Sequence, residues 1–168
     1  MSLFALRIPK AASDSLGNAV VAAGGEAAEG HDVRLANVPK GMTAIAILRD
    51  PVDRFRSAYD MHWNTDTNGI VRRYPSVDAF AEAGPDVWAE WGQAFKPSSW
   101  WLSSAAYVRK RRAIVIPYER MRDVLFEIGI RGIRPTHVTH IRHELRSVGP
   151  VIEHYAADYA MREALFGE

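Results

Sequence analysis

The run Thr43-Ala-Ile-Ala-Ile-Leu48 carries no charged side chain, and it limits the possible folds more than any other stretch of the chain. A strand with one face in water alternates apolar and polar residues, whereas a strand covered on both faces is apolar throughout. The run therefore predicts a buried strand in a sheet that has helices on both sides. No apolar run in the sequence approaches the roughly 20 residues that span a membrane.

Strand-like and helix-like segments alternate along the rest of the 168 residues. Further strands are predicted at 2–7, 32–38 and 113–116, with a loop at 26–30. The spacing of apolar residues predicts helices at 13–23, 51–59, 77–83, 87–91, 98–108, 119–128 and 151–166. This order predicts an α/β fold in a single domain, residues 1–168, with a central, mainly parallel β-sheet flanked by helices.

The composition argues against several classes of function. The net charge is +1, which gives no overall attraction for nucleic acid or for an anionic membrane, so neither is expected as a partner. The absence of cysteine excludes disulfides and thiolate zinc sites. Arg7 and Lys10 interrupt the apolar N-terminal stretch, so it does not resemble a signal peptide and a cytoplasmic location is expected.

The stretch from Phe4 to Leu16 predicts a strand, a tight loop and the start of a helix. Such a loop directs backbone N–H groups, the Lys10 ammonium and hydroxyl groups toward one point, which suits an anion at a helix N-terminus. The alternative interpretation is an ordinary turn in which Ser13 or Asp14 caps the helix.

A second stretch, from Ile47 to Tyr59, places an arginine directly after the predicted buried strand. Asp50 is a good N-cap and Pro51 a good first helical residue, so Ser57 falls on the following helix. Ligands of parallel sheets bind beyond the carboxyl ends of the strands, where Lys10 and Arg49 would both lie. The alternative is that Arg49 pairs with a neighbouring aspartate on the surface while Ser57 only fills space.

Together, the two stretches resemble the sulfotransferases that use 3′-phosphoadenosine 5′-phosphosulfate (PAPS). The run Pro9-Lys10-Ala11-Ala12-Ser13-Asp14-Ser15-Leu16 is similar to the family's 5′-phosphosulfate loop, and the run from Arg49 to Tyr59 is similar to its 3′-phosphate motif. Weaker similarity continues at 99–102, 115–121 and 155–159. The resemblance is closest to the carbohydrate and protein sulfotransferase branch.

The resemblance implies a P-loop NTPase-like sulfotransferase fold, PAPS as cosubstrate and no metal. It implies that Lys10 contacts the sulfonate and the bridging oxygen, and that Arg49 and Ser57 hold the 3′-phosphate. The cosubstrate-binding set that it implies is Lys10, Ala11, Ala12, Ser13, Asp14, Ser15, Leu16, Arg49 and Ser57. Sulfuryl transfer depends on in-line positioning and on neutralising the leaving phosphate, which these residue types can provide.

Asp14 and His31 both bear on how the implied site would work. The family usually has a hydroxyl residue where Asp14 stands, and a carboxylate there repels an anion unless it faces away, pairs with a cation or is protonated. The resemblance also implies a base near the second strand, where His31 has a suitable ordinary pKa. Glu29 and Glu26 are the alternatives to His31, and a solvated loop histidine is the non-catalytic interpretation.

Three weaker patterns remain. His137, His140 and His143 recur every third residue, but this spacing lacks the usual ligand signature, so we expect a polar surface segment and not a metal site. Most of the tryptophans are expected in the core, although such rings can also stack on a ligand. The run Arg109-Lys110-Arg111-Arg112 is expected to be a solvated helix end rather than an anion-binding surface.

The first functional hypothesis is sulfuryl transfer from PAPS to a hydroxyl or amine on a small molecule or a carbohydrate. The alternative is a nucleotide-binding or interaction module with the same fold and weakened catalysis. A nucleotide kinase is disfavoured because the chain lacks a glycine-rich loop that ends in Gly-Lys-Ser/Thr. The acceptor pocket is expected in the variable segment 64–97, and neither the acceptor nor the oligomeric state follows from the sequence.

Overall fold

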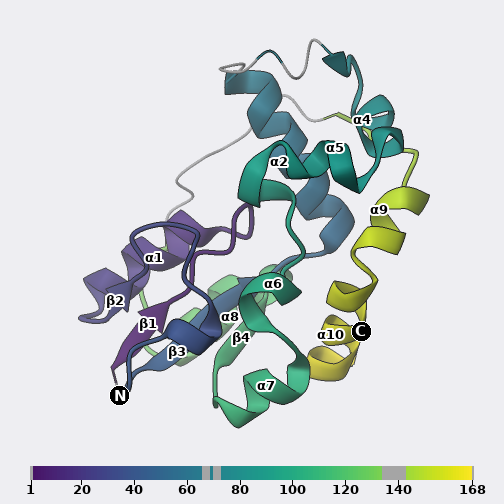
Figure 1. Cartoon of the computed structure of the whole chain (residues 1–168). Coiled ribbons are helices and arrows are strands. Elements are labelled where there is room, and N and C mark those ends of the chain that lie inside the picture. Colours follow the sequence, from purple (N-terminus) through teal and green to yellow (C-terminus); the bar gives the residue numbers. More distant parts are fainter. Residues whose placement is uncertain (1, 66–68, 70–72, 134–142, 168) are drawn as a thin grey trace.

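The computed structural model describes residues 2–65, 69, 73–133 and 143–167. Within this part of the chain, four parallel strands form one sheet in the order β2-β1-β3-β4 (Figure 1). The strands are β1 (Leu3–Ala5), β2 (Glu26–Ala27), β3 (Thr43–Leu48) and β4 (Ile114–Pro117). The predicted α/β class with a parallel sheet is confirmed, and the run at 43–48 is the longest strand, with five of its six residues buried.

Helices surround this sheet and extend well beyond one end of it (Figure 1). Within the described ranges the α-helices are α1 (Ser13–Ala22), α2 (Pro51–Thr65), α4 (Val77–Ala83), α5 (Pro85–Ala89), α6 (Ser99–Leu102), α7 (Ala105–Lys110), α8 (Met121–Glu127), α9 (Gly149–His154) and α10 (Ala156–Phe166). Short 3₁₀ turns lie at η1 (Leu35–Asn37), η2 (Gly92–Phe95) and η3 (Tyr118–Arg120). In the described part of the chain, none of the helices combines the length and the apolar character needed to cross a bilayer.

Two apolar clusters hold these elements together. In the first, the sheet packs against α1, α6, α7, α8 and α10. In the second, which lies in the upper part of Figure 1, α2 packs against α4, α5, η2 and α9 around the ring of Phe55. Phe55 contacts the rings of Phe80, Trp88, Phe95 and Tyr155, with centroid separations from 4.8 to 6.5 Å.

The prediction of the second strand is wrong. Residues 32–38 form the 3₁₀ turn η1 and its flanks, and the strand β2 instead lies in the predicted loop 26–30. Leu35 and Val38 give this stretch its apolar character, but they are buried in the first cluster from a turn and its flank, not from a strand. Gly25 brings β2 beside β1, since a Cβ there would lie 2.7 Å from the carbonyl oxygen of Leu3 and 2.7 Å from Cγ1 of Val20.

Two predicted helices are each divided in two. The segment 98–108 breaks at Ser103, whose φ is +69°, and Ser104 then caps α7 by accepting from the amide of Tyr107 at 3.2 Å. The segment 151–166 breaks at Tyr155, between α9 and α10. The Tyr155 hydroxyl donates to the Phe95 carbonyl at 2.5 Å, and burial raises its pKa to about 12, so it stays protonated as a donor.

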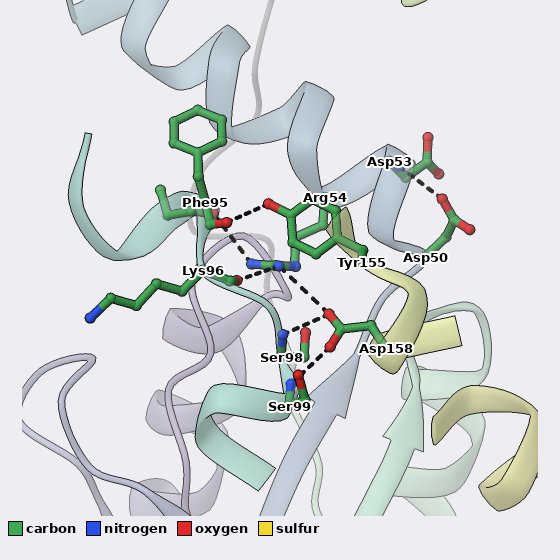
Figure 2. Close-up of polar contacts among 10 residues, drawn as sticks. Asp50, Asp53, Arg54, Phe95, Lys96, Ser98, Ser99, Tyr155 and Asp158 are labelled. Atoms are coloured by element: carbon green, nitrogen blue, oxygen red, sulfur yellow. Dashed lines mark hydrogen bonds and ion pairs between the residues drawn. The ribbon is translucent and has the colours of Figure 1, made fainter. Parts of the chain in front are cut away.

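A buried ion pair connects α2 with α10 (Figure 2). Arg54 and Asp158 are fully buried, with Nη2 and Oδ2 3.8 Å apart. The guanidinium donates to the carbonyls of Ala94 at 3.2 Å and Lys96 at 2.5 Å. The carboxylate accepts from the amides of Ser98 at 2.6 Å and Ser99 at 2.8 Å. Each charge is therefore hydrogen-bonded as well as paired, which is what makes its burial tolerable.

We predict that Asp158→Ala lowers the free energy of unfolding by about 3–5 kcal/mol, because it leaves the Arg54 charge buried without its partner. Urea unfolding followed by circular dichroism measures the change. Glu163→Ala, at an exposed position of the same helix, serves as the control and is expected to change stability by less than about 0.5 kcal/mol. A loss below about 1.5 kcal/mol for Asp158→Ala would contradict the prediction.

Candidate active site

The strand order creates a crevice between β1 and β3. The chain leaves β1 toward β2 on one side and leaves β3 toward β4 on the other, so the connections diverge at the carboxyl ends of these two neighbouring strands. Ligands of open parallel sheets bind at such a point. The loop after β1 carries Lys10 and the loop after β3 carries Arg49. Nη1 of Arg49 donates to the carbonyl oxygen of Lys10 at 3.2 Å, so the two loops are joined.

A cavity of about 1160 Å³ opens at this crevice. The predicted site residues that line it are Lys10, Ala12, Ser13, Asp14, Ser15, His31, Arg49 and Ser57. Ala11 and Leu16 do not line it. Their side chains are buried in the first cluster, and their amides donate to the carbonyls of Ile8 and Ala12. All the predicted site residues except these two therefore line one cavity. Ala11 and Leu16 instead attach the loop to the core.

The loop before α1 has an unusual backbone. Lys10 and Ala12 have φ of +60° and +54°, in the left-handed region that non-glycine residues rarely occupy. Alternation between right-handed and left-handed residues turns successive N–H groups toward one point, which creates a concave site for an anion. Among the described residues, no backbone carbonyl accepts from the amides of Ala12 and Ser13.

The N-cap of α1 is Ala12, with no capping side chain, so the predicted cap at Ser13 or Asp14 is wrong. Both residues belong to the first turn of the helix. The helix therefore begins earlier than a side-chain cap at Ser13 or Asp14 would require, and no side chain caps its first amides.

The Asp14 carboxylate pairs with Arg7. Nη2 of Arg7 donates to Oδ1 of Asp14, and Nη1 donates to the carbonyls of Ala28 at 3.4 Å and Glu29 at 3.3 Å. This contact meets one of the conditions under which a carboxylate can lie beside an anion, because the guanidinium offsets its charge. It also ties α1 to the segment that follows β2.

Lys10 and Arg49 concentrate positive charge in the crevice. Burial lowers the pKa of Lys10 below its ordinary value, and the nearby Arg49 charge lowers it further. The Arg49 guanidinium lies over the Tyr118 ring, 4.7 Å from its centroid. An incoming anion would relieve the repulsion between the two cations, so the site favours negatively charged ligands.

His31, the predicted base, lies at the cavity wall with a fixed orientation. Its Nδ1 is 2.6 Å from the carbonyl oxygen of Arg7, so Nδ1 carries the proton and donates. Its backbone carbonyl accepts from the indole N–H of Trp101 at 2.6 Å. In the neutral ring, Nε2 is then the nitrogen with a free lone pair.

A second histidine in the cavity wall was not predicted. His62 lies on α2, five positions after Ser57, and its ring packs between Trp91 and Phe95. Burial lowers its pKa, and the charge of Lys10 lowers it further. Little in the sequence pointed to this histidine, because the position of its ring depends on how residues 91–95 pack against α2.

The weaker patterns play other roles. His137 and His140 lie outside the described residues, and His143 pairs with the buried Asp60 carboxylate at 2.7 Å. Within the described ranges, no three histidine, aspartate or glutamate side chains gather as metal ligands do.

Trp88, Trp91 and Trp101 are buried, as predicted for most of the tryptophans, and Trp91 also borders the cavity. The side chains of 109–112 are exposed, as expected of a solvated helix end.

Comparison of the chain with known protein families, with curated proteins and with solved structures found no match.

We predict that Lys10→Met raises the thermal midpoint of unfolding at pH 7. Burial disfavours the charged amine in the folded state, so its cost is present below the folded pKa and disappears above the ordinary value of 10.5. The stabilisation should therefore shrink as the pH rises toward 11. Calorimetry over this pH range measures it, with Lys110→Met at an exposed position as the control. A lower midpoint for Lys10→Met at pH 7 would rule out a cost of charge burial.

Proposed function

We propose that this protein is a PAPS-dependent sulfotransferase that transfers a sulfuryl group to a hydroxyl or amine of a small-molecule or carbohydrate acceptor. One observation carries the proposal. The Lys10 loop and the pair Arg49 and Ser57 come from different strand ends, yet they line one cavity at the crevice of a parallel sheet. These are the two anion-binding motifs that resemble the family. The finer fold assignment, a P-loop NTPase-like sulfotransferase fold, is part of the proposal.

The two motifs divide the donor nucleotide between them. The amides of Ala12 and Ser13 and the side chains of Lys10, Ser13 and Ser15 would hold the 5′-phosphosulfate. Arg49 and Ser57 would hold the 3′-phosphate. Charge-assisted hydrogen bonds of this kind are the strong ones, and the arginine fork suits a phosphate. Ala11 and Leu16 would support the loop without contacting the nucleotide.

The chemistry requires little covalent participation by the protein. The acceptor oxygen attacks sulfur in line with the bond to the 5′-phosphate, and negative charge develops on the bridging oxygen as that bond breaks. Lys10 would neutralise this charge, while the loop amides hold the phosphate still. The proposal assigns charge neutralisation to Lys10, Arg49 and backbone donors. His31, the base expected from the sequence, borders the cavity, and so does His62.

We predict that 3′,5′-ADP, the nucleotide product, binds to the protein and raises its thermal midpoint. Arg49→Ala and Lys10→Ala should each weaken binding by about 10- to 100-fold, because each removes a charged hydrogen bond to a phosphate. Isothermal titration calorimetry measures the dissociation constants. Arg109→Ala, at an exposed position far along the chain, should bind as the unchanged protein does. Absence of any response to 3′,5′-ADP would refute the proposed function.

A nucleotide-binding module with weakened catalysis remains the second candidate, because the Asp14 carboxylate lines the cavity beside the loop amides. We predict sulfuryl transfer from ³⁵S-labelled PAPS to at least one member of a panel of hydroxyl and amine acceptors. Tight binding of 3′,5′-ADP without transfer to any acceptor, by this chain and by its Asp14→Ser variant, would favour the binding module.

A further inference from the structure

The Asp14 carboxylate works against the binding of an anion at the Lys10 loop. It lines the cavity and belongs to the first turn of α1. Burial and the Arg49 charge lower the pKa of Lys10, whereas the Asp14 charge raises it, so the carboxylate is felt at the loop lysine. The same charge would repel a phosphosulfate held by this loop unless another group offsets it.

Arg7 is placed to offset that charge, although Arg7 itself does not line the cavity. Its Nη2 donates to Oδ1 of Asp14, and its Nη1 donates to the carbonyls of Ala28 and Glu29. The side chains of Arg7 and Asp14 are 23% and 32% exposed, so the pair is partly withdrawn from water. Solvent and salt screen such a pair less than a surface pair, and loss of one partner leaves the other charge uncompensated.

The Arg7 guanidinium is fixed by its surroundings. Its stem runs close to α1, because a Cβ at Gly17 would lie 3.5 Å from Nε and 3.9 Å from Cδ of Arg7. Nε is buried and has no hydrogen-bond partner in the part of the chain that the structure describes, so the contacts of Nη1 and Nη2 set the orientation of the fork. One side of the fork is anchored on the segment after β2, and the other side holds the Asp14 carboxylate. Arg7 therefore fixes the position of the carboxylate as well as offsetting its charge.

We propose that Arg7 is a positioning residue for the donor nucleotide: by holding and neutralising Asp14, it allows an acidic residue to lie in the loop that binds the 5′-phosphosulfate. This inference rests on the proposed function. Arg7 makes no contact with the nucleotide, because it lies outside the residues that line the cavity. Arg7 and Asp14 therefore act as a unit, and donor binding needs the arginine only while position 14 carries a carboxylate.

A purely structural role for Arg7 makes different predictions. The same guanidinium ties Ala28 and Glu29 to α1, so its loss could loosen this side of the cavity. A loosened cavity would bind every nucleotide less well, and neutralising Asp14 would not restore it. The two roles therefore differ in which part of the nucleotide is affected and in whether the charge at position 14 matters.

Isothermal titration calorimetry with 3′,5′-ADP and with adenosine 3′-monophosphate, which lacks the 5′-phosphate, separates the two roles. Arg7→Met keeps an unbranched stem beside Gly17 and removes the charge. It should weaken the binding of 3′,5′-ADP by about 10-fold, as one like charge beside a bound anion does, and that of adenosine 3′-monophosphate by less than about threefold. Asp14→Asn, alone or combined with Arg7→Met, should bind 3′,5′-ADP within about threefold of the unchanged protein. Arg56→Met, which breaks the ion pair with Asp53 at 2.7 Å on α2, is the matched control and should change neither affinity.

Rescue of Arg7→Met by Asp14→Asn is the decisive outcome, because a structural defect would persist in the double variant. An equal loss of affinity for both nucleotides, or a double variant that binds as weakly as Arg7→Met, would overturn the proposal. Asp14→Asn alone tests it even where Arg7→Met does not fold. A gain of 10-fold or more in its affinity for 3′,5′-ADP would show that Arg7 does not offset the carboxylate. Failure of the unchanged protein to bind 3′,5′-ADP would instead refute the proposed function, so the two failures are distinct.

Discussion

The buried charge of Arg54 connects the helices and turns that pack beside the cavity. Its guanidinium joins α2 to the carbonyls of Ala94 and Lys96 and to Asp158 on α10 (Figure 2). Through these contacts the segment that contains Trp91 and Phe95 is pressed against α2, where both rings meet His62. The part of the cavity wall formed by Trp91 and His62 therefore depends on an ion pair whose residues do not line the cavity.

The Lys10 loop, in contrast, contains backbone conformations and a charged group that are unfavourable on their own. Two non-glycine residues have positive φ, and a lysine is partly desolvated beside an arginine. Strained backbone and perturbed charge persist only where the surroundings hold them, and they concentrate at functional sites. Here the support comes from the buried side chains of Ala11 and Leu16 and from the ion pair between Arg7 and Asp14.

The sequence predicted well the features that depend on local signals. The apolar run at 43–48 became β3, and Asp50 caps α2 by accepting from the Asp53 amide at 2.9 Å. The convergence of Lys10 and Arg49 also followed, because parallel strands end at one edge of a sheet. The strand β2 could not be predicted, since its two residues pair through their backbones and carry no apolar pattern. The same holds for His62, whose environment is assembled by residues distant in the sequence.

The helix α2 places Ser57 and His62 in the wall of the cavity. Ser57 and His62 are separated by five positions, which corresponds to about 7.5 Å along a helix axis. A rigid helix therefore fixes the spacing between Ser57, to which the proposal assigns the 3′-phosphate, and the His62 ring, whereas the Lys10 loop follows another strand. The Arg49 guanidinium donates to the Lys10 carbonyl and so connects the loop before α2 with the Lys10 loop. Burial and the charge of Lys10 lower the pKa of His62, so an anion that neutralises the lysine would also raise the pKa of this ring.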